Sequence, residues 1–332
     1  MDRRYSRRAF VRDLALLPCG IPLLASCLHQ TRPARVRRIG FMIGSGYLPL
    51  EAAFKDELRG LGYIQGANLV IEPGSSRPST AEVTDLAMEL GHMNLELVVA
   101  GALPFALAMR SANPAMPMVI ATCPGMISNG FARTLEHPGG NVTGIDELPP
   151  GVTATRLTLL KTAVPALSRV ALLSTTPGRG GHETQLVDAE RAATALDIQV
   201  RVYRATSPEE LGKALAAIAH ESMDGLLNFQ GGLSLAFRQR IVDFAAEHRL
   251  PAIYQATLFA EAGGLMSWAP DLEHQYRMAA HYVDKILLGA SPGDLPIAFP
   301  PKYYLTVHAG TAHRLGLTLP PALLAQATRI LS

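Results

Sequence analysis

The sequence predicts an α/β protein of two doubly wound, Rossmann-like lobes joined by a hinge. Each lobe has a parallel sheet with helices on both faces. Short apolar runs of strand length alternate with segments of helical periodicity along most of the chain. This alternation occurs twice, at an offset of about 131 residues. The length of 332 residues also suggests about two domains.

The first copy of the pattern begins at Arg38–Gly44, an apolar run that ends in glycine. Phe54, Leu58 and Leu61 then recur at helical spacing, and Gly62 can end that helix. Three more strands are expected in this copy: Leu69–Ile71, Leu95–Ala100 and Met118–Thr122.

The second copy begins at the strand Arg169–Ser174, and an apolar stripe from Leu186 to Leu196 predicts the helix after it. Its further strands are expected at Ile198–Val202, Gly225–Phe229 and Ala252–Gln255.

Both copies carry the same helix-start signal, Ser79–Glu82 in the first and Ser207–Glu210 in the second. In such a capping box the Ser oxygen accepts from the amide three residues on, and the Glu reaches back to the Ser amide. Pro208 suits the first helical position.

The chain continues beyond the repeat with an amphipathic helix at His274–Leu288 and a strand at Tyr303–Val307. We expect these segments to cross between the lobes and fix the hinge. The predicted organisation is a signal at 1–27, a tether at 28–38, a first lobe at 39–145 with about 272–290, and a second lobe at 146–271 with about 291–332.

The N-terminus predicts export. Ser6–Arg12 closely resembles the twin-arginine motif, and the apolar stretch Leu14–Ser26 is too short and too broken by proline and glycine to span a bilayer. It ends in Leu24–Cys27, which looks like a lipobox and would make Cys27 the acylated first residue of the mature chain. An ordinary cleaved signal with an incidental cysteine is the alternative.

Charge and cysteine content exclude several classes. Residues 1–38 hold nine Arg and two Asp, which leaves the remainder with 21 basic and 26 acidic residues. A remainder with a net negative charge is not expected to have the basic surface that binds nucleic acid. Three cysteines cannot form a disulfide scaffold, and we expect Cys123 to be a buried structural residue. Neither a metal nor a cofactor is predicted.

Seven short motifs follow one another in the sequence: Pro138–Gly144, Leu250–Tyr254, Ala262–Trp268, Tyr282–Gly289, Asp294–Ile297, Lys302–Leu305 and Thr311–Leu317. Together, in this order, they resemble the ABC-transporter substrate-binding proteins of the tryptophan/tyrosine-binding type, and the resemblance covers about residues 37–331. That resemblance implies a type I periplasmic-binding-protein fold, a small-molecule ligand held between the lobes, and an ABC permease as partner.

The chain departs from that family at three dipeptides, two of which contain an aspartate in the family. Gly125-Met126 stands in place of Asp-Pro, Thr175-Thr176 in place of Asn-Pro, and Gln230-Gly231 in place of Pro-Asp. A carboxylate is the natural partner of a ligand ammonium. We therefore expect a neutral or anionic ligand.

Candidate ligand contacts lie in the loops at the strand ends, where ordinary turn chemistry is the alternative for each residue. Trp268 could stack on a flat ligand, whereas Asp271 is expected to cap the helix after it. The candidates are Ser45, Gly46, Tyr47, Gly101, Ala102, Thr122, Ser174, Thr175, Asn228, Gln230, Tyr254 and Trp268.

Enzyme motifs are incomplete. Gly44–Pro49 lacks the third glycine of a dinucleotide fingerprint, and His182–Leu186 lacks the second histidine of a metalloprotease helix. We expect no catalysis and a periplasmic, membrane-anchored, monomeric lipoprotein that delivers its ligand to the permease. A ligand sensor for a partner receptor and an α/β enzyme remain the alternatives.

Overall fold

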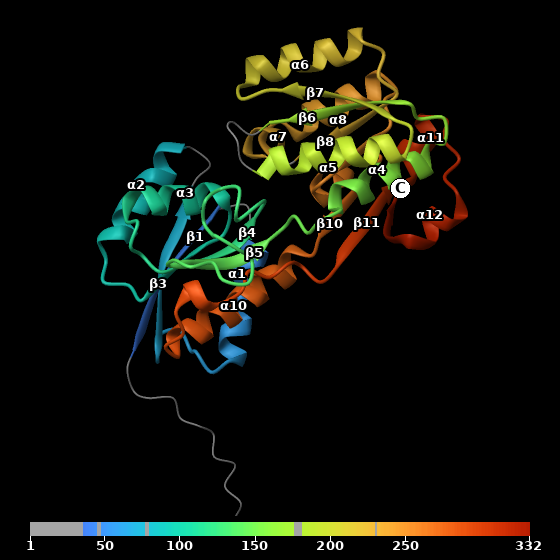
Figure 1. The fold of residues 1–332 in the computed structure, drawn as a ribbon. Helices are drawn as coiled ribbons and strands as arrows, with labels where there is room; N and C mark the ends of the chain where they lie inside the picture. Colours follow the sequence, from blue (N-terminus) through green and yellow to red (C-terminus); the bar gives the residue numbers. More distant parts are fainter. Residues whose placement is uncertain (1–35, 45–47, 77–79, 176–180, 230) are drawn as a thin grey trace, which may run out of the picture. The chain divides into compact units, whose positions relative to one another are not determined.

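A computed structural model describes the chain except for residues 1–35, 45–47, 77–79, 176–180 and 230. Residues 35–332 form one compact unit, and Figure 1 traces its elements along the sequence. The described elements form two sheets, one of five strands and one of seven. This is the predicted α/β class.

The first sheet is built of parallel strands in the order β2-β1-β3-β4-β5. Non-consecutive neighbours mean that the chain crosses over between strands, as a doubly wound sheet requires. The strands are β1 (Arg37–Gly44), β2 (Leu69–Ser76), β3 (Leu97–Ala100), β4 (Met118–Cys123) and β5 (Val142–Asp146).

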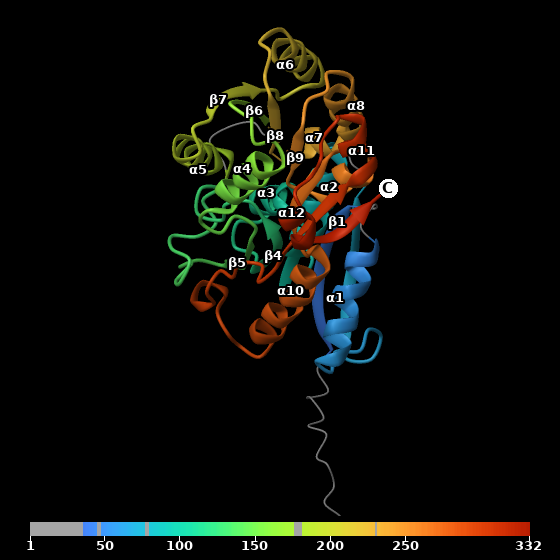
Figure 2. The ribbon, with the colours of Figure 1, turned by 90° about the vertical axis from the view of Figure 1, so that its right-hand side faces the viewer.

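Helices cover both faces of this sheet: α1 (Leu48–Gly60) and α10 (Leu272–Leu287) one face, α2 (Thr80–His92) and α3 (Leu103–Ala112) the other. Alternate residues of β1 explain the division. Phe41 packs with Phe54 of α1 and Tyr276 of α10, while Met42 joins the cluster under α2 and α3. Figure 2 shows α1 and α10 side by side.

The second sheet has the order β12-β11-β10-β9-β8-β6-β7. It is parallel except where β10 meets β11, whose directions are opposed. Its strands are β6 (Arg169–Ser174), β7 (Gln199–Arg204), β8 (Gly225–Asn228), β9 (Ala252–Tyr254), β10 (Met266–Pro270), β11 (Tyr303–His308) and β12 (Ala327–Leu331).

Two further clusters form the core on either side of this sheet. One lies under α4 (Val152–Ala163), α5 (Gly181–Ala195) and α12 (Pro321–Gln326); the other lies under α6 (Pro208–His220), α8 (Arg238–Glu247) and α9 (Thr257–Glu261). The remaining short helices are α7 (Gly232–Ala236), α11 (Ala309–Arg314) and the 3-10 helix η2 (Pro292–Asp294).

Three segments connect the two sheets, after β5, after β10 and before β11. They are joined by hydrogen bonds: the Tyr303 hydroxyl donates to the Glu147 carbonyl (2.7 Å), and the Tyr304 hydroxyl donates to the Asp271 carboxylate (3.3 Å). Residues 291–298, predicted to belong to the second lobe, bond instead to β5: the Asp146 amide donates to the Ala298 carbonyl (2.9 Å).

The helix-start signals can be compared with the structure at one of the two boxes, because Ser79 lies outside the described residues. Ser207 caps α6 as predicted, its hydroxyl accepting from the Glu210 amide at 3.2 Å. The Glu210 carboxylate, however, accepts from the Thr206 amide (2.7 Å) and hydroxyl (2.6 Å), one residue earlier than the box predicts.

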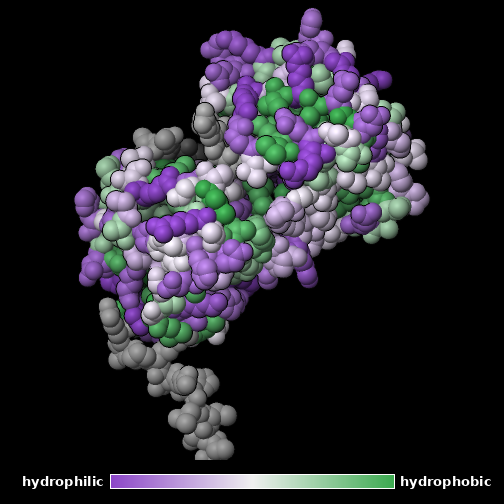
Figure 3. All heavy atoms as spheres, viewed as in Figure 1, coloured by the Kyte–Doolittle hydropathy of each residue, from purple (hydrophilic) through white to green (hydrophobic). Residues whose placement is uncertain are grey.

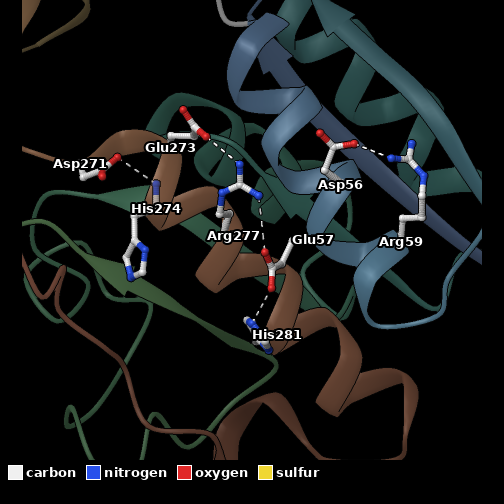
Figure 4. Close-up of polar contacts among 8 residues, drawn as sticks. All are labelled: Asp56, Glu57, Arg59, Asp271, Glu273, His274, Arg277 and His281. Carbon is white, nitrogen blue, oxygen red and sulfur yellow. Dashed lines mark hydrogen bonds and ion pairs between the residues drawn. The ribbon is translucent and has the colours of Figure 1, made fainter.

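Helix α10 is attached to α1 by an exposed ion-pair network (Figure 4). Glu57 of α1 lies 3.5 Å from Arg277 and 3.0 Å from His281 of α10. Exposed pairs of this kind contribute little stability, so the apolar contacts beneath them hold the two helices together.

The surface in Figure 3 carries its hydrophobic residues in separate patches divided by hydrophilic ones. Within the part of the chain that the structure describes, no helix is both long and apolar enough to cross a membrane.

Candidate functional site

The carboxyl ends of β6, β8 and β9 bring four of the predicted residues together. These strands are parallel neighbours, with Leu173 opposite Asn228 and Asn228 opposite Tyr254. Ser174 and Thr175 follow Leu173 directly, so they belong to the same edge. All four side chains are buried.

Several polar atoms at this edge have no hydrogen-bond partner among the described residues. They are both side-chain polar atoms of Asn228 and the Thr175 hydroxyl. An unsatisfied buried polar group costs about 1–3 kcal/mol of stability. Such groups are typical of functional sites, where a ligand or water supplies the missing partner. Every one of these side chains is neutral.

Tyr254 also has a structural role, because its ring stacks on Phe259 at 4.8 Å within the core cluster under α6, α8 and α9. Burial raises the pKa of its hydroxyl above the usual range. The hydroxyl is therefore neutral. The ring runs toward the amino end of β10, because a Cβ at Gly264, just before that strand, would lie 2.5 Å from the tyrosine Cε2. The hydroxyl is thus directed into the core and away from the strand ends.

A pair of glutamines that was not predicted from the sequence lies at the same edge. The Gln255 amide, which follows β9, donates to Gln185 of α5, and both side chains are buried. The Gln185 amide nitrogen has no partner among the described residues. The sequence signal for this pair was Gln185, a polar residue directly before Leu186, where the apolar stripe of the predicted helix begins.

At the first sheet, the predicted residues are engaged in the fold. The Gly101 carbonyl accepts from the Thr122 hydroxyl at 3.0 Å and from the Tyr276 hydroxyl at 2.9 Å. A Cβ atom at Gly101 would lie 2.6 Å from that Tyr276 hydroxyl and 2.9 Å from the Met42 carbonyl, so close packing requires glycine here. Ala102 stands at the N-terminus of α3.

Trp268 lies in β10 and stacks on Tyr303 of β11, with ring centroids 5.8 Å apart. Its carbonyl accepts from the Arg156 guanidinium at 3.0 Å. Arg156 is 1 % exposed although it belongs to the apolar stripe of α4, and its Nη1 has no partner among the described residues. A lone arginine on an apolar stripe is the sequence signal that would have identified it.

The acids near the connecting segments are held by the protein itself. Asp146 accepts from the backbone amides of Gly125 (2.9 Å), Met126 (2.7 Å) and Leu148 (2.9 Å). Burial nevertheless raises its pKa, against the three amides that lower it. Asp271 caps α10 as predicted, accepting from the His274 amide at 3.0 Å (Figure 4).

Glu147 is the third acid in this region. Burial, followed by the neighbouring Asp146, raises its pKa to about 7, while the Arg156 guanidinium acts in the opposite direction. The carboxyl is therefore only partly ionised at neutral pH.

The other predicted site residues lie outside the described part of the chain: Ser45, Gly46, Tyr47, Gln230 and the predicted lipidation site Cys27. Cys123 is buried, as predicted, and burial raises the pKa of its thiol.

Two linked α/β sheets of mostly parallel strands have the architecture of the periplasmic-binding-protein fold. The chain belongs to the family of ABC transporter substrate binding proteins, whose model matches residues 40–331. The family implies an extracytoplasmic location, and it comprises solute-binding proteins rather than enzymes.

Known relatives agree with this assignment. A tyrosine-binding protein of Clostridioides difficile (strain R20291) is 22% identical over 272 residues, which are 81% of this chain and 77% of that protein. A Streptococcus pneumonia structure, an ABC domain in complex with L-Trp, covers 90% of this chain and 100% of its own, with a TM-score of 0.76 and 21% identity. A conserved domain protein from Vibrio cholerae covers the same shares with a TM-score of 0.79 and 24% identity.

Proposed function

We propose that this protein captures a neutral or anionic small molecule and delivers it to an ABC permease, with the ligand held by the carboxyl-terminal strand ends of both sheets. The observation that carries the ligand class is the neutral, unpartnered polar pair of Thr175 and Asn228. Hydroxyls and amides of this kind suit carbonyl, hydroxyl and carboxylate groups.

An amino-acid zwitterion fits this chemistry poorly. Its ammonium needs a carboxylate once it is desolvated. Asp146 and Asp271 are already committed to backbone amides, and Glu147 is only partly ionised at neutral pH. The internal segments outside the described residues, 45–47, 77–79, 176–180 and 230, contain no Asp or Glu in the sequence. Tryptophan and tyrosine, which relatives bind, should therefore bind weakly here.

Calorimetry of the purified mature protein tests this ligand class against a panel of amino acids, carboxylates and neutral heterocycles. We expect micromolar or weaker dissociation constants for tryptophan and tyrosine, and tighter binding for a neutral or anionic compound. Nanomolar tryptophan binding would contradict the proposal and would identify Glu147 as the first acid to test, through Glu147→Gln.

We also propose export through the twin-arginine motif and acylation at Cys27, which would hold the protein near its permease. Mass spectrometry of the membrane fraction should show a mature chain that begins with acylated Cys27. Cys27→Ser should release the protein from the membrane, and Arg7→Lys with Arg8→Lys should block export. An unmodified chain with any other N-terminus would refute acylation.

A further inference from the structure

A pocket of about 420 Å³ lies in the first lobe, away from the strand ends discussed above. The amino ends of β4 and β5 contribute Met118 and Val142 to its wall, and the loop Pro138–Asn141 lines it as well. The carboxyl ends of the same strands lie at the opposite edge of the sheet, so this pocket is separate from the proposed ligand site.

Two arginines line this pocket. Arg110 of α3 is fixed in place: its Nη1 donates to the carbonyls of Asn129 (2.9 Å) and Gly130 (3.3 Å), and its guanidinium lies 4.3 Å from the centre of the Phe131 ring. A guanidinium fixed in this way loses little entropy when it binds an anion. Its remaining N–H groups are available for an anion.

Arg133 is exposed and lies beside Gly139, where a Cβ atom would be 3.3 Å from the arginine Cδ. No carboxylate among the described residues forms an ion pair with Arg110 or Arg133. The pocket amides are occupied: Asn113 donates to the Gly91 carbonyl at 2.9 Å, and Asn141 donates to the Met116 carbonyl at 2.6 Å. The pocket therefore offers positive charge that the protein does not neutralise.

The pocket also lies at the edge of the sheet where the described chain begins. All strands of the first sheet are parallel, and β1 starts at Arg37 on the same edge as the starts of β4 and β5. Only β3 separates β1 from β4, a spacing of about 10 Å. Residues 28–36 can span at most roughly 30 Å when fully extended. An acyl chain on Cys27 would thus keep this edge close to the membrane.

We propose that this pocket binds a phosphate-type oxyanion through Arg110 and Arg133. The group is either the head group of an anionic phospholipid or a soluble phosphate ester. The lipid source rests on the proposed acylation of Cys27, whereas the binding chemistry of the pocket does not. Bidentate donation from guanidinium to phosphate supplies the affinity, and Phe131 fixes the orientation of Arg110.

The first experiment measures binding of glycerol 1-phosphate to residues 28–332, which include the whole compact unit, by calorimetry. Arg133→Gln removes one exposed cation and should weaken binding at least tenfold, as should Arg110→Gln. Arg238→Gln is the matched control, because it removes an exposed arginine of the second lobe that donates only to a carbonyl. It should leave binding unchanged.

The second experiment measures co-sedimentation of the same proteins with vesicles of phosphatidylcholine, with and without phosphatidylglycerol. Residues 28–332 hold 25 basic and 26 acidic residues, so bulk charge does not favour anionic vesicles. The lipid head group is identified as the ligand if binding requires phosphatidylglycerol, if Arg133→Gln weakens it, and if the soluble ester does not bind. Binding of the soluble ester that the same variant weakens would identify the free anion.

The proposal is overturned if neither probe binds, or if Arg133→Gln and Arg238→Gln behave alike with both probes. Failure of the ligand panel or of acylation would leave the result with the soluble ester unchanged, so the proposed function and this inference fail separately.

Discussion

Replacing Asn228 with leucine should stabilise the ligand-free protein. Asn228 is fully buried at the end of β8, and neither its amide nitrogen nor its amide oxygen has a partner among the described residues. Unsatisfied buried groups cost about 1–3 kcal/mol, and leucine has the same branching without polar atoms. The larger methyl groups consume part of that gain. We expect the free energy of unfolding to rise by about 1–2 kcal/mol.

Urea unfolding followed by circular dichroism measures the change. Asn113→Leu is the matched control, because the Asn113 amide donates to the Gly91 carbonyl and its oxygen accepts from the Ala115 amide at 3.2 Å. Losing these bonds should lower the free energy of unfolding by about 1–3 kcal/mol. Asn228→Leu should at the same time weaken binding of any ligand that the calorimetric panel identifies.

A loss of stability in Asn228→Leu as large as that in Asn113→Leu would contradict this prediction. Asn228 would then have partners in solution, and its burial would no longer indicate a binding role.

Two further predictions concern the close packing at Gly101 and the buried carboxyl of Glu147. Gly101→Ala should lower the free energy of unfolding by about 1–3 kcal/mol, because the new Cβ would clash with the Met42 carbonyl and the Tyr276 hydroxyl. Thermal unfolding measures this loss. The control Gly60→Ala should show no such loss, because a Cβ there meets nothing within 4 Å. Folding raises the pKa of Glu147 from 4.5 to about 7, so its contribution favours the folded state at acid pH and is lost as the pH rises through about 7. In urea unfolding, the free energy of unfolding of the wild type should therefore fall by about 1–3 kcal/mol relative to that of Glu147→Gln between pH 4.5 and 8, because glutamine cannot ionise. Parallel pH profiles of the two proteins would contradict the raised pKa.

The local order of elements could be predicted from the sequence, whereas part of their pairing could not. Strands such as Arg169–Ser174 are short apolar runs followed by a segment of helical periodicity. This alternation is enough to predict that such a run forms a strand. The antiparallel pairing of β10 with β11 and the bonding of residues 291–298 to β5 depend on contacts between distant parts of the chain. Local patterns carry no information on such pairings.

The sequence could predict which end of each sheet carries the candidate site. It could not predict which of the residues there are free to contact a ligand. Topology places the end of each parallel strand at one edge, which is why Thr175, Asn228 and Tyr254 come together. Whether such a residue is free to bind depends on its partners, as Gly101 illustrates by accepting two hydroxyls. Arg156 was missed because a charged residue on a helix is ordinarily expected to face solvent.

The buried polar edge links stability to binding. Because Thr175 and Asn228 lack partners within the described residues, the ligand-free fold carries a cost that a ligand with matching groups removes. A ligand that binds only the folded state stabilises it by about 2.7 kcal/mol at a hundred times its dissociation constant. For a given compound at a fixed concentration, the rise in melting temperature should therefore be clear in the wild type and small in Asn228→Leu. An equal rise in both proteins would mean that the compound binds elsewhere on the molecule.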